Sequence, residues 1–193
     1  MSPASDPCRH TFGGAALSVR AARPDEYPHV ADLVVRGFLD GPYGHLPVSP
    51  QRSALLADSA GRAAAGALLV AVDTAADARA DAGGPAAAVL GTLTLLRPGT
   101  PASRLARPDE AELRILAVAS AARGHGVGEA LVRGTFAVAA GWGARAVVLD
   151  TGPLNHPAQR LYERVGFVHL VERGLADENP LIGQALVYSY RLG

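Results

Sequence analysis

Residues Ala111 to Val132 read AELRILAVASAARGHGVGEALV. The stretch begins as an apolar strand, continues through three alternating glycines (Gly124, Gly126, Gly128) and ends as an amphipathic helix. A glycine loop that leads into a helix N-terminus presents backbone N–H groups without internal partners at the positive end of the helix dipole. We therefore expect this stretch to bind phosphate oxygens and the rest of the chain to be arranged around it.

The composition is that of a globular protein. The chain has 193 residues, of which 49% are apolar and 19% charged, and this predicts one domain. We expect a flexible N-terminal arm at residues 1–16 and a single domain at residues 17–193, because the arm is rich in turn-forming residues and has no periodicity.

Charge and cysteine content exclude several classes of protein. The formal net charge is zero and no basic run occurs, so neither a nucleic acid nor a membrane is expected as a partner. A single cysteine, Cys8, and the absence of a signal pattern or of an apolar run of about 20 residues predict a cytoplasmic protein. The chain contains no lysine, which excludes a P-loop lysine and a Schiff-base lysine. The histidines show no metal-ligand spacing, so no metal is expected.

Hydrophobic periodicity predicts an α/β fold, with a mixed β-sheet and helices on both faces. Strands are expected at Leu17–Arg20, Ala67–Val72, Ala87–Leu96, Ala111–Val118, Ala146–Leu149, Phe167–Val171 and Ala185–Arg191. Helices are expected to start at Arg23, Ser49, Val127 and Asn155, the last with Gly166 as its C-cap. The segment DTAADARADAGGP (residues 73–85) has no packing pattern and is predicted to be a mobile hairpin loop. The fully apolar run AVVL (146–149) indicates a central, parallel strand.

Two phosphate-binding motifs can be tested against the glycine loop. The dinucleotide fingerprint needs a small residue five positions after its first glycine, but Glu129 and Leu131 occupy that position in the two registers. The Walker loop needs a lysine, and there is none. A purely structural turn remains as the alternative to a third kind of phosphate site.

The loop Arg123–Gly128 (RGHGVG) resembles the acyl-CoA loop, Gln/Arg-x-x-Gly-x-Gly/Ala, of the GNAT N-acetyltransferases. The segment Leu154–Phe167 (LNHPAQRLYERVGF) is similar to the second CoA-side motif of that family, in which an Asn precedes a helix that ends in Leu-Tyr-x-x-x-Gly-Phe. The resemblance covers about a third of the chain. It implies the GNAT fold and an acetyl-CoA-dependent N-acyltransferase that acetylates a primary amine of a small molecule or peptide.

The resemblance also implies which residues bind acetyl-CoA. The pyrophosphate would lie on the backbone of the glycine loop, and the pantetheine against the end of the preceding strand and against Asn155. The implied cofactor-binding residues are Leu116, Ala117, Val118, Arg123, Gly124, His125, Gly126, Val127, Gly128, Asn155 and Tyr162. Each has a simpler alternative: solvated side chains at Arg123 and His125, core packing along the strand, and an N-cap at Asn155.

Three residues are the catalytic candidates on the same resemblance. The backbone N–H of Leu116 would face the thioester carbonyl, Glu112 would be the general base, and Tyr162 the general acid. Strict alternation places Glu112, Arg114 and Leu116 on one face of the strand. Glu112 could instead be a surface residue paired with Arg114, with Glu110 or Asp109 or a chain of waters as the base, and Tyr162 could be a packing residue.

The acceptor is the part that the sequence describes least. The resemblance places it between the segments 38–49 and 172–184, with Phe38 and Tyr43 as candidate substrate-binding residues. Acids in the second segment (Glu172, Asp177, Glu178) suggest a cationic amine. A non-catalytic acyl-CoA-binding regulatory module of the same fold is the alternative to an enzyme, and a homodimer is left open.

Overall fold

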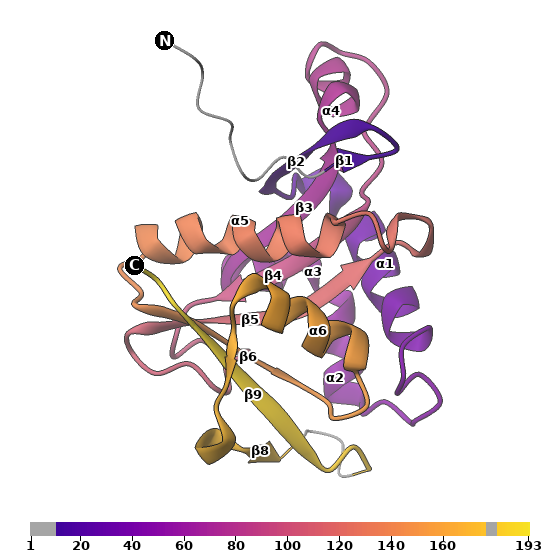
Figure 1. The fold of residues 1–193 in the computed structure, drawn as a ribbon. Helices are drawn as coiled ribbons and strands as arrows, with labels where there is room; N and C mark the ends of the chain where they lie inside the picture. Colours follow the sequence, from indigo (N-terminus) through magenta and orange to yellow (C-terminus); the bar gives the residue numbers. More distant parts are fainter. Residues whose placement is uncertain (1–10, 177–180) are drawn as a thin grey trace.

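A mixed β-sheet runs through the whole molecule (Figure 1). The computed structural model describes residues 11–176 and 181–193. Within this part of the chain the strand order is β1-β2-β3-β4-β5-β6-β9-β7, and β8 pairs with β9. The pair β5–β6 is parallel and the other pairs are antiparallel. The strands are β1 (Thr11–Phe12), β2 (Ala15–Ala21), β3 (Gly66–Asp73), β4 (Gly91–Leu96), β5 (Glu110–Val118), β6 (Ala146–Thr151), β7 (Val168–His169), β8 (Leu175–Ala176) and β9 (Gln184–Arg191).

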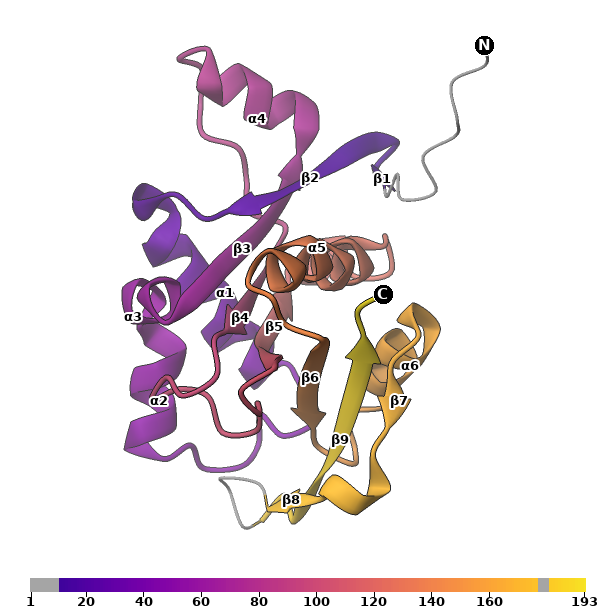
Figure 2. The same cartoon turned by 90° about the vertical axis from the view of Figure 1, so that its left-hand side faces the viewer.

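Helices cover both faces of the sheet, as the sequence predicts (Figure 2). One face carries α1 (Tyr27–Leu39), α2 (Pro50–Ala57) and α3 (Ser59–Ala64), and the other carries α5 (Val127–Gly141) and α6 (His156–Val165). The remaining helix is α4 (Thr74–Asp81), and three 3₁₀ turns lie at Pro24–Glu26, Ser120–Ala122 and Val171–Arg173. The predicted α/β class is confirmed.

The main core lies between the sheet and the pair α5–α6. Leu131 and Val132 of α5 are fully buried against Leu93 of β4 and Leu149 of β6. The apolar strand β6 is parallel to β5 and lies inside the sheet, as its sequence predicts. This packing fixes the ends of β5 and β6 relative to the start of α5.

Glycines and caps end several elements where expected. Gly166 closes α6 with φ +107°, a conformation that residues with a Cβ rarely adopt. The helix expected from Ser49 consists of two, because Asp58 leaves the helical conformation and caps α3 by accepting the Gly61 N–H. Ser49 caps α2 through a hydrogen bond from the Arg52 N–H.

The predicted mobile loop at 73–85 is wrong, because the structure has the helix α4 there. Asp73 caps it by accepting the Ala76 N–H at 2.7 Å. Asp77 forms ion pairs with Arg20 of β2 (2.8 Å) and Arg23 (3.2 Å). The helix is therefore attached through charges, which a search for apolar periodicity does not detect.

Two further expectations differ at the edges of the sheet. Of the arm expected at 1–16, residues 11–12 form β1 and residues 15–16 begin β2, and residues 1–10 lie outside the described part. The strand expected at Phe167–Val171 is reduced to β7, because the chain turns into a 3₁₀ segment at Val171.

Candidate active site

Strands β5 and β6 separate beyond their first residues and leave a gap in the sheet. Their parallel register runs from Glu110 opposite Ala146 to Leu113 opposite Leu149 and then ends. On its other side β5 has a bulge against β4, where the register skips Ile115 and Leu116. Ile115 has φ +55°, which a β-branched residue adopts only when its surroundings impose it.

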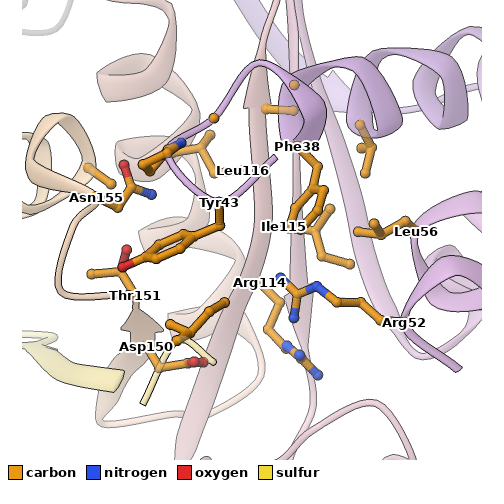
Figure 3. Close-up of a pocket in the computed structure, with 18 of the residues that line it drawn as sticks. Phe38, Tyr43, Arg52, Leu56, Arg114, Ile115, Leu116, Asp150, Thr151 and Asn155 are labelled. Atoms are coloured by element: carbon orange, nitrogen blue, oxygen red, sulfur yellow. The ribbon is translucent and has the colours of Figure 1, made fainter. Parts of the chain in front are cut away.

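A cavity of about 220 Å³ occupies this gap (Figure 3). Its wall combines the end of β5, the end of β6, the start of α6, the helices α1 and α2, and the segment after α1. The polar and aromatic residues among the described lining are Phe38, Tyr43, Arg52, Arg114, Asp150, Thr151, Asn155 and Tyr162. Residues from distant parts of the sequence thus meet around one small space.

The glycine loop lies directly before α5. Gly124 and Gly126 have φ values of +80° and +75°, and Gly126 is the N-cap of α5 without a side-chain cap. A Cβ added at Gly128 would lie 3.2 Å from the Leu161 side chain of α6. Gly124 is exposed and Gly126 is half-buried, so the backbone of the loop is accessible, and the first N–H groups of a 15-residue helix point out of its N-terminus. This geometry suits an anion.

The side chains of Arg123 and His125 are exposed and contact the protein rather than the cavity. The Arg123 guanidinium pairs with Asp40 at 3.3 Å and donates to the Val118 carbonyl at 3.2 Å. The His125 ring lies edge-on to Phe12 with centroids 5.2 Å apart. Both side chains therefore contact other parts of the protein in the structure.

The bulge also changes the faces of β5. Leu116 and Val118 pack against the main core, and Ile115 and Ala117 pack on the α1–α2 side. Glu112 and Leu116 therefore lie on opposite faces, and the expectation of one shared face is wrong. The period of two fails because the bulge adds one residue to the strand.

Glu112 does not line the cavity. It is fully buried, and its Oε2 atom accepts hydrogen bonds from the Ser103 hydroxyl and from the backbone N–H groups of Arg104, Leu105 and Ala106, three of them at 2.8 Å. Its Oε1 atom lies 3.7 Å from Nε of Arg114. The carboxylate therefore holds the segment that precedes β5. The alternative of a surface residue is wrong as to exposure, although the pairing with Arg114 that it included is present.

Tyr162 lines the cavity from α6 and is buried. Its ring packs near Phe167 and Tyr188, with centroid distances of 5.8 and 6.2 Å. Burial raises the pKa of the Tyr162 phenol, and the negative charge of Asp150 raises it further. The phenol therefore keeps its proton across the physiological pH range.

Asn155 is the residue for which the sequence leaves two roles open, a helix N-cap and a contact with the pantetheine. It is the N-cap residue of α6, but its side chain makes no cap hydrogen bond. The side chain instead lines the cavity near Leu116 (Figure 3). This arrangement leaves the amide available to a ligand.

Phe38 and Tyr43 form the wall that faces β6. The Tyr43 hydroxyl accepts a hydrogen bond from the Leu154 N–H at 2.6 Å, and its ring covers Gly152, where an added Cβ would lie 2.4 Å from the ring. The Phe38 ring lies under the Arg52 guanidinium, 5.1 Å from its carbon to the centroid. The Tyr43 contacts connect the segment after α1 to the loop before α6, and the Phe38 contact connects α1 to α2.

The sequence interpretation missed three charged residues of the cavity, Arg52, Arg114 and Asp150. The sequence partly indicates Asp150, because this residue directly follows the apolar run 146–149 of the central strand β6. That strand lies beside β5 where the two strands separate. Arg52 comes from α2, and nothing local in the sequence connects α2 with β5. Of the acids in the segment 172–184, Glu172 is exposed, while Asp177 and Glu178 lie outside the described residues.

The described residues contain neither a cluster of metal-binding side chains nor a helix that could span a membrane. No group of three or more histidine, cysteine or acidic side chains in this part of the chain is arranged to hold a metal ion. No helix among the described residues has the length and apolar character to cross a membrane.

Comparisons with known proteins agree with this geometry. The model of the acetyltransferase (GNAT) family matches residues 44–167, which include β5, the glycine loop and α6. No curated protein matches the chain.

Solved structures share the fold. A GCN5-related N-acetyltransferase from Kribbella flavida is 24% identical, with a TM-score of 0.66 over 91% of this chain and 98% of that one. A GNAT-family acetyltransferase from Staphylococcus aureus Mu50 is 12% identical, with a TM-score of 0.65 over 92% and 100%. The yncA protein of Salmonella typhimurium, solved with its cofactor acetyl-CoA, is 17% identical, with a TM-score of 0.64 over 92% and 94%. The family match covers more than half of the chain, and the chain therefore belongs to the GNAT acetyltransferase family.

Proposed function

We propose that the chain is an acetyl-CoA-dependent N-acetyltransferase that acts on a primary amine. The observation that carries the proposal is the cavity between β5 and β6, which joins the end of β5, Asn155 and Tyr162, while the glycine loop follows the same strand along the chain. The solved relative that holds acetyl-CoA has the same fold, and this supports acetyl-CoA as the acyl donor.

Acetyl-CoA would be held by backbone groups more than by charged side chains. The N–H groups from Gly124 to Gly128, at the start of α5, would bind the pyrophosphate. The pantetheine would enter the gap beside Leu116, Ala117 and Val118, with the Asn155 amide as a further contact. This route leads the thioester to the bulge in β5.

The transfer step begins with attack of a neutral amine nitrogen on the thioester carbonyl carbon. The new C–N bond moves an electron pair onto the carbonyl oxygen, which the Leu116 N–H would stabilise. One such donor aimed at the developing oxyanion contributes about 3 kcal/mol to the barrier reduction. The bulge supports this role, because the ladder with β4 skips Leu116.

The amine must lose a proton before it attacks, because alkyl amines have pKa values of about 10 and are therefore protonated at neutral pH. Asp150 is the acid among the described residues that line the cavity, and its carboxylate pairs with Arg104 at 3.1 Å. We assign Asp150 the task of receiving the ammonium group and passing its proton to water. Glu112, the base expected from the sequence, is a positioning residue in this account, because four donors already occupy Oε2.

Collapse of the tetrahedral intermediate breaks the C–S bond and leaves a CoA thiolate. Tyr162 would donate its phenolic proton to that sulfur, and its place in the cavity and its raised pKa support this role. The nitrogen of the intermediate gives its second proton to water, so that the products are the N-acetylated amine and free CoA thiol, and the phenol regains its proton from solvent.

A thiol-release assay with acetyl-CoA and a panel of amines tests the proposal. The panel contains amino acids, polyamines, aminoglycosides and peptide N-termini. We expect amine-dependent release of CoA with at least one class. If acetyl-CoA binds but no amine in the panel releases CoA, the chain is the non-catalytic acyl-CoA-binding module instead.

A further inference from the structure

The cavity between β5 and β6 has a polar side and an apolar side (Figure 3). The polar side is formed by the end of β6 and the N-cap of α6, with Asp150, Thr151 and Asn155. The apolar side faces α1 and α2, with Phe38, Leu56 and Ile115. A ligand that fills the whole cavity must therefore itself have a polar end and an apolar end.

The bulge in β5 contributes to the apolar side. Leu113 packs in the main core, and regular alternation would place Ile115 on the same face of the strand. Instead, Ile115 has φ +55° and packs on the side of α1 and α2, against Val34 and Leu56. The departure from regular strand geometry therefore brings a large aliphatic side chain into the cavity wall.

Part of this apolar wall is uncovered. Phe38, Leu55 and Ile115 line the cavity and are each only half-buried. The neighbouring Val34 and Leu56 are buried, with 2% and 6% of each residue exposed. Removal of apolar surface from water is favourable, so an apolar group of a ligand would be stabilised by covering these three side chains.

Close contacts restrict this space to a compact group. Helix α1 approaches β5 at Gly37, where an added Cβ would lie 3.1 Å from the Cβ of Ala117. The Tyr43 ring closes the cavity against Gly152 in the same way. The volume of about 220 Å³ is below the range of about 300–1,000 Å³ that is typical of pockets for drug-sized ligands.

Two arginines mark the boundary of the apolar side, and both are engaged with the protein. The Arg52 guanidinium lies over the Phe38 ring at 5.1 Å, and Arg114 donates to the Ala102 carbonyl at 2.6 Å. Both residues also line a second cavity of about 560 Å³, between α2, α3 and the segment 101–104. An apolar chain that passed this boundary would cover charged groups, which is unfavourable because they lose hydration.

We propose that the acceptor is a primary amine that carries a compact apolar group, such as a short alkyl chain or a phenyl ring. The apolar group packs against Phe38, Leu55 and Ile115, while the nitrogen faces the thioester beside Leu116. This inference rests on the proposed N-acetyltransferase function and narrows its acceptor. A free alkyl amine and a peptide whose first side chain is apolar share this chemistry.

A series of linear alkylamines tests the inference. Ethylamine, propylamine, butylamine, pentylamine and octylamine have nearly the same amine pKa, so their chemical reactivity is nearly constant. We expect kcat/KM, measured by CoA release at saturating acetyl-CoA, to rise about fourfold per added methylene as far as pentylamine. It should rise no further for octylamine. A flat series would overturn the apolar subsite, and a continued rise to octylamine would overturn its compact size.

Butylamine and 2-methoxyethylamine separate apolar contact from size, because the two amines differ by one ether oxygen in place of a methylene. The oxygen lowers the pKa of the amine and increases its neutral fraction, which by itself favours the ether. We expect butylamine to have a kcat/KM about tenfold higher. Equal values, or a preference for the ether, would contradict the inference.

Two further pairs distinguish a small molecule from a peptide as the source of the apolar group. Leucinamide is compared with serinamide, and a tripeptide that begins with leucine is compared with one that begins with serine. Preference for leucine in either pair supports the inference, and the pair that shows it identifies the source. No preference for leucine in both pairs counts against it.

Variants of Leu55 identify the wall responsible. Leu55→Ala should lower kcat/KM for butylamine about tenfold and leave ethylamine within about twofold, whereas Leu55→Met, of similar volume, should keep the wild-type series. The control is Leu39→Ala, because Leu39 lies on α1 with 57% of the residue exposed and does not line the cavity. This control should also keep the series, and an unchanged series in Leu55→Ala would refute the assignment.

Failure of the inference and failure of the proposed function give different results. If CoA is released but apolar amines have no advantage, the apolar acceptor is wrong and the acetyltransferase remains. If no alkylamine and no other amine of the panel releases CoA, the proposed function fails and the inference fails with it.

Discussion

The Oε2 atom of Glu112 accepts the backbone N–H of Leu105 at 2.8 Å, and this contact ties β5 to the segment before it. The same oxygen also receives Ser103, Arg104 and Ala106. One carboxylate therefore organises a whole turn of backbone close to Arg114, which lines the cavity between β5 and β6.

Glu112→Gln should destabilise the protein, because the amide replaces an ionised acceptor of four hydrogen bonds in a fully buried position. Because hydrogen bonds to a buried charged group are strong, we expect the free energy of unfolding to fall by about 3 kcal/mol. Urea denaturation measures this loss. Glu110→Gln is the matched control on the same strand, where the carboxylate pairs with Arg173 at 2.7 Å, and should cost less. A positioning role also predicts an unchanged shape of the kcat/KM pH profile. Loss of its acidic limb in Glu112→Gln would return the general-base role to Glu112.

Tyr162→Phe should lower kcat by about 100-fold and leave the Kd for acetyl-CoA within about twofold, since only the proton donor is removed. Turnover kinetics and calorimetric binding check the two numbers. Tyr188→Phe is the control, because Tyr188 packs near the Tyr162 ring but donates its hydroxyl to Glu163 at 3.1 Å. An unchanged kcat in Tyr162→Phe removes this residue from the acid role.

Gly126→Ala should weaken acetyl-CoA binding at least tenfold. An alanine at φ +75° is strained by about 1–2 kcal/mol. A change of backbone conformation that relieves this strain would turn the first N–H groups of α5 away from the pyrophosphate. Gly143→Ala carries the same backbone cost at φ +78°, beyond the other end of α5. Calorimetry should show wild-type affinity for the control, and equal weakening in both variants would refute a specific role for the loop.

The charge network that holds α4 predicts a pH-dependent stability. Hydrogen bonds from Arg20 lower the pKa of Asp77 below its usual value near about 4. A carboxyl whose folded-state pKa is depressed stabilises the fold above its unfolded pKa, and this contribution disappears as the pH falls through the folded value. Asp77→Asn should therefore lower Tm by roughly 5 °C at pH 7 and by progressively less below about pH 4.

Exposed Asp25 provides the control for this network, because it takes no part in the pairs of Arg20 and Arg23. Asp25→Asn should leave Tm unchanged at both pH values. A constant difference in Tm between Asp77→Asn and the wild type across the titration would contradict the assignment.

The glycine loop and α6 could be predicted from the sequence because their signals are local. Gly126 and Gly166 mark a helix start and a helix end through conformations that favour glycine, and both stand there in the structure. The apolar run of β6 similarly predicts a central strand. In each case the residues that specify the element are also the residues that form it.

The faces of β5 could not be predicted, because the bulge depends on the partner strands. Ile115 is a good strand residue, and nothing in its neighbours marks the positive φ that shifts Leu116 to the opposite face from Glu112. The charged residues in the cavity wall could not be predicted from the sequence for a related reason. Arg52 and Asp150 are 98 residues apart in the numbering and meet only after β5 and β6 separate.

Identification of the acetylated product tests the central claim most directly. Wild-type protein is incubated with isotope-labelled acetyl-CoA and the amine panel, and the labelled products are identified by mass spectrometry. We predict a labelled N-acetyl amine in the wild type and about 100-fold slower formation in Tyr162→Phe. Measurable binding of acetyl-CoA with no labelled amine from any member of the panel would contradict the account.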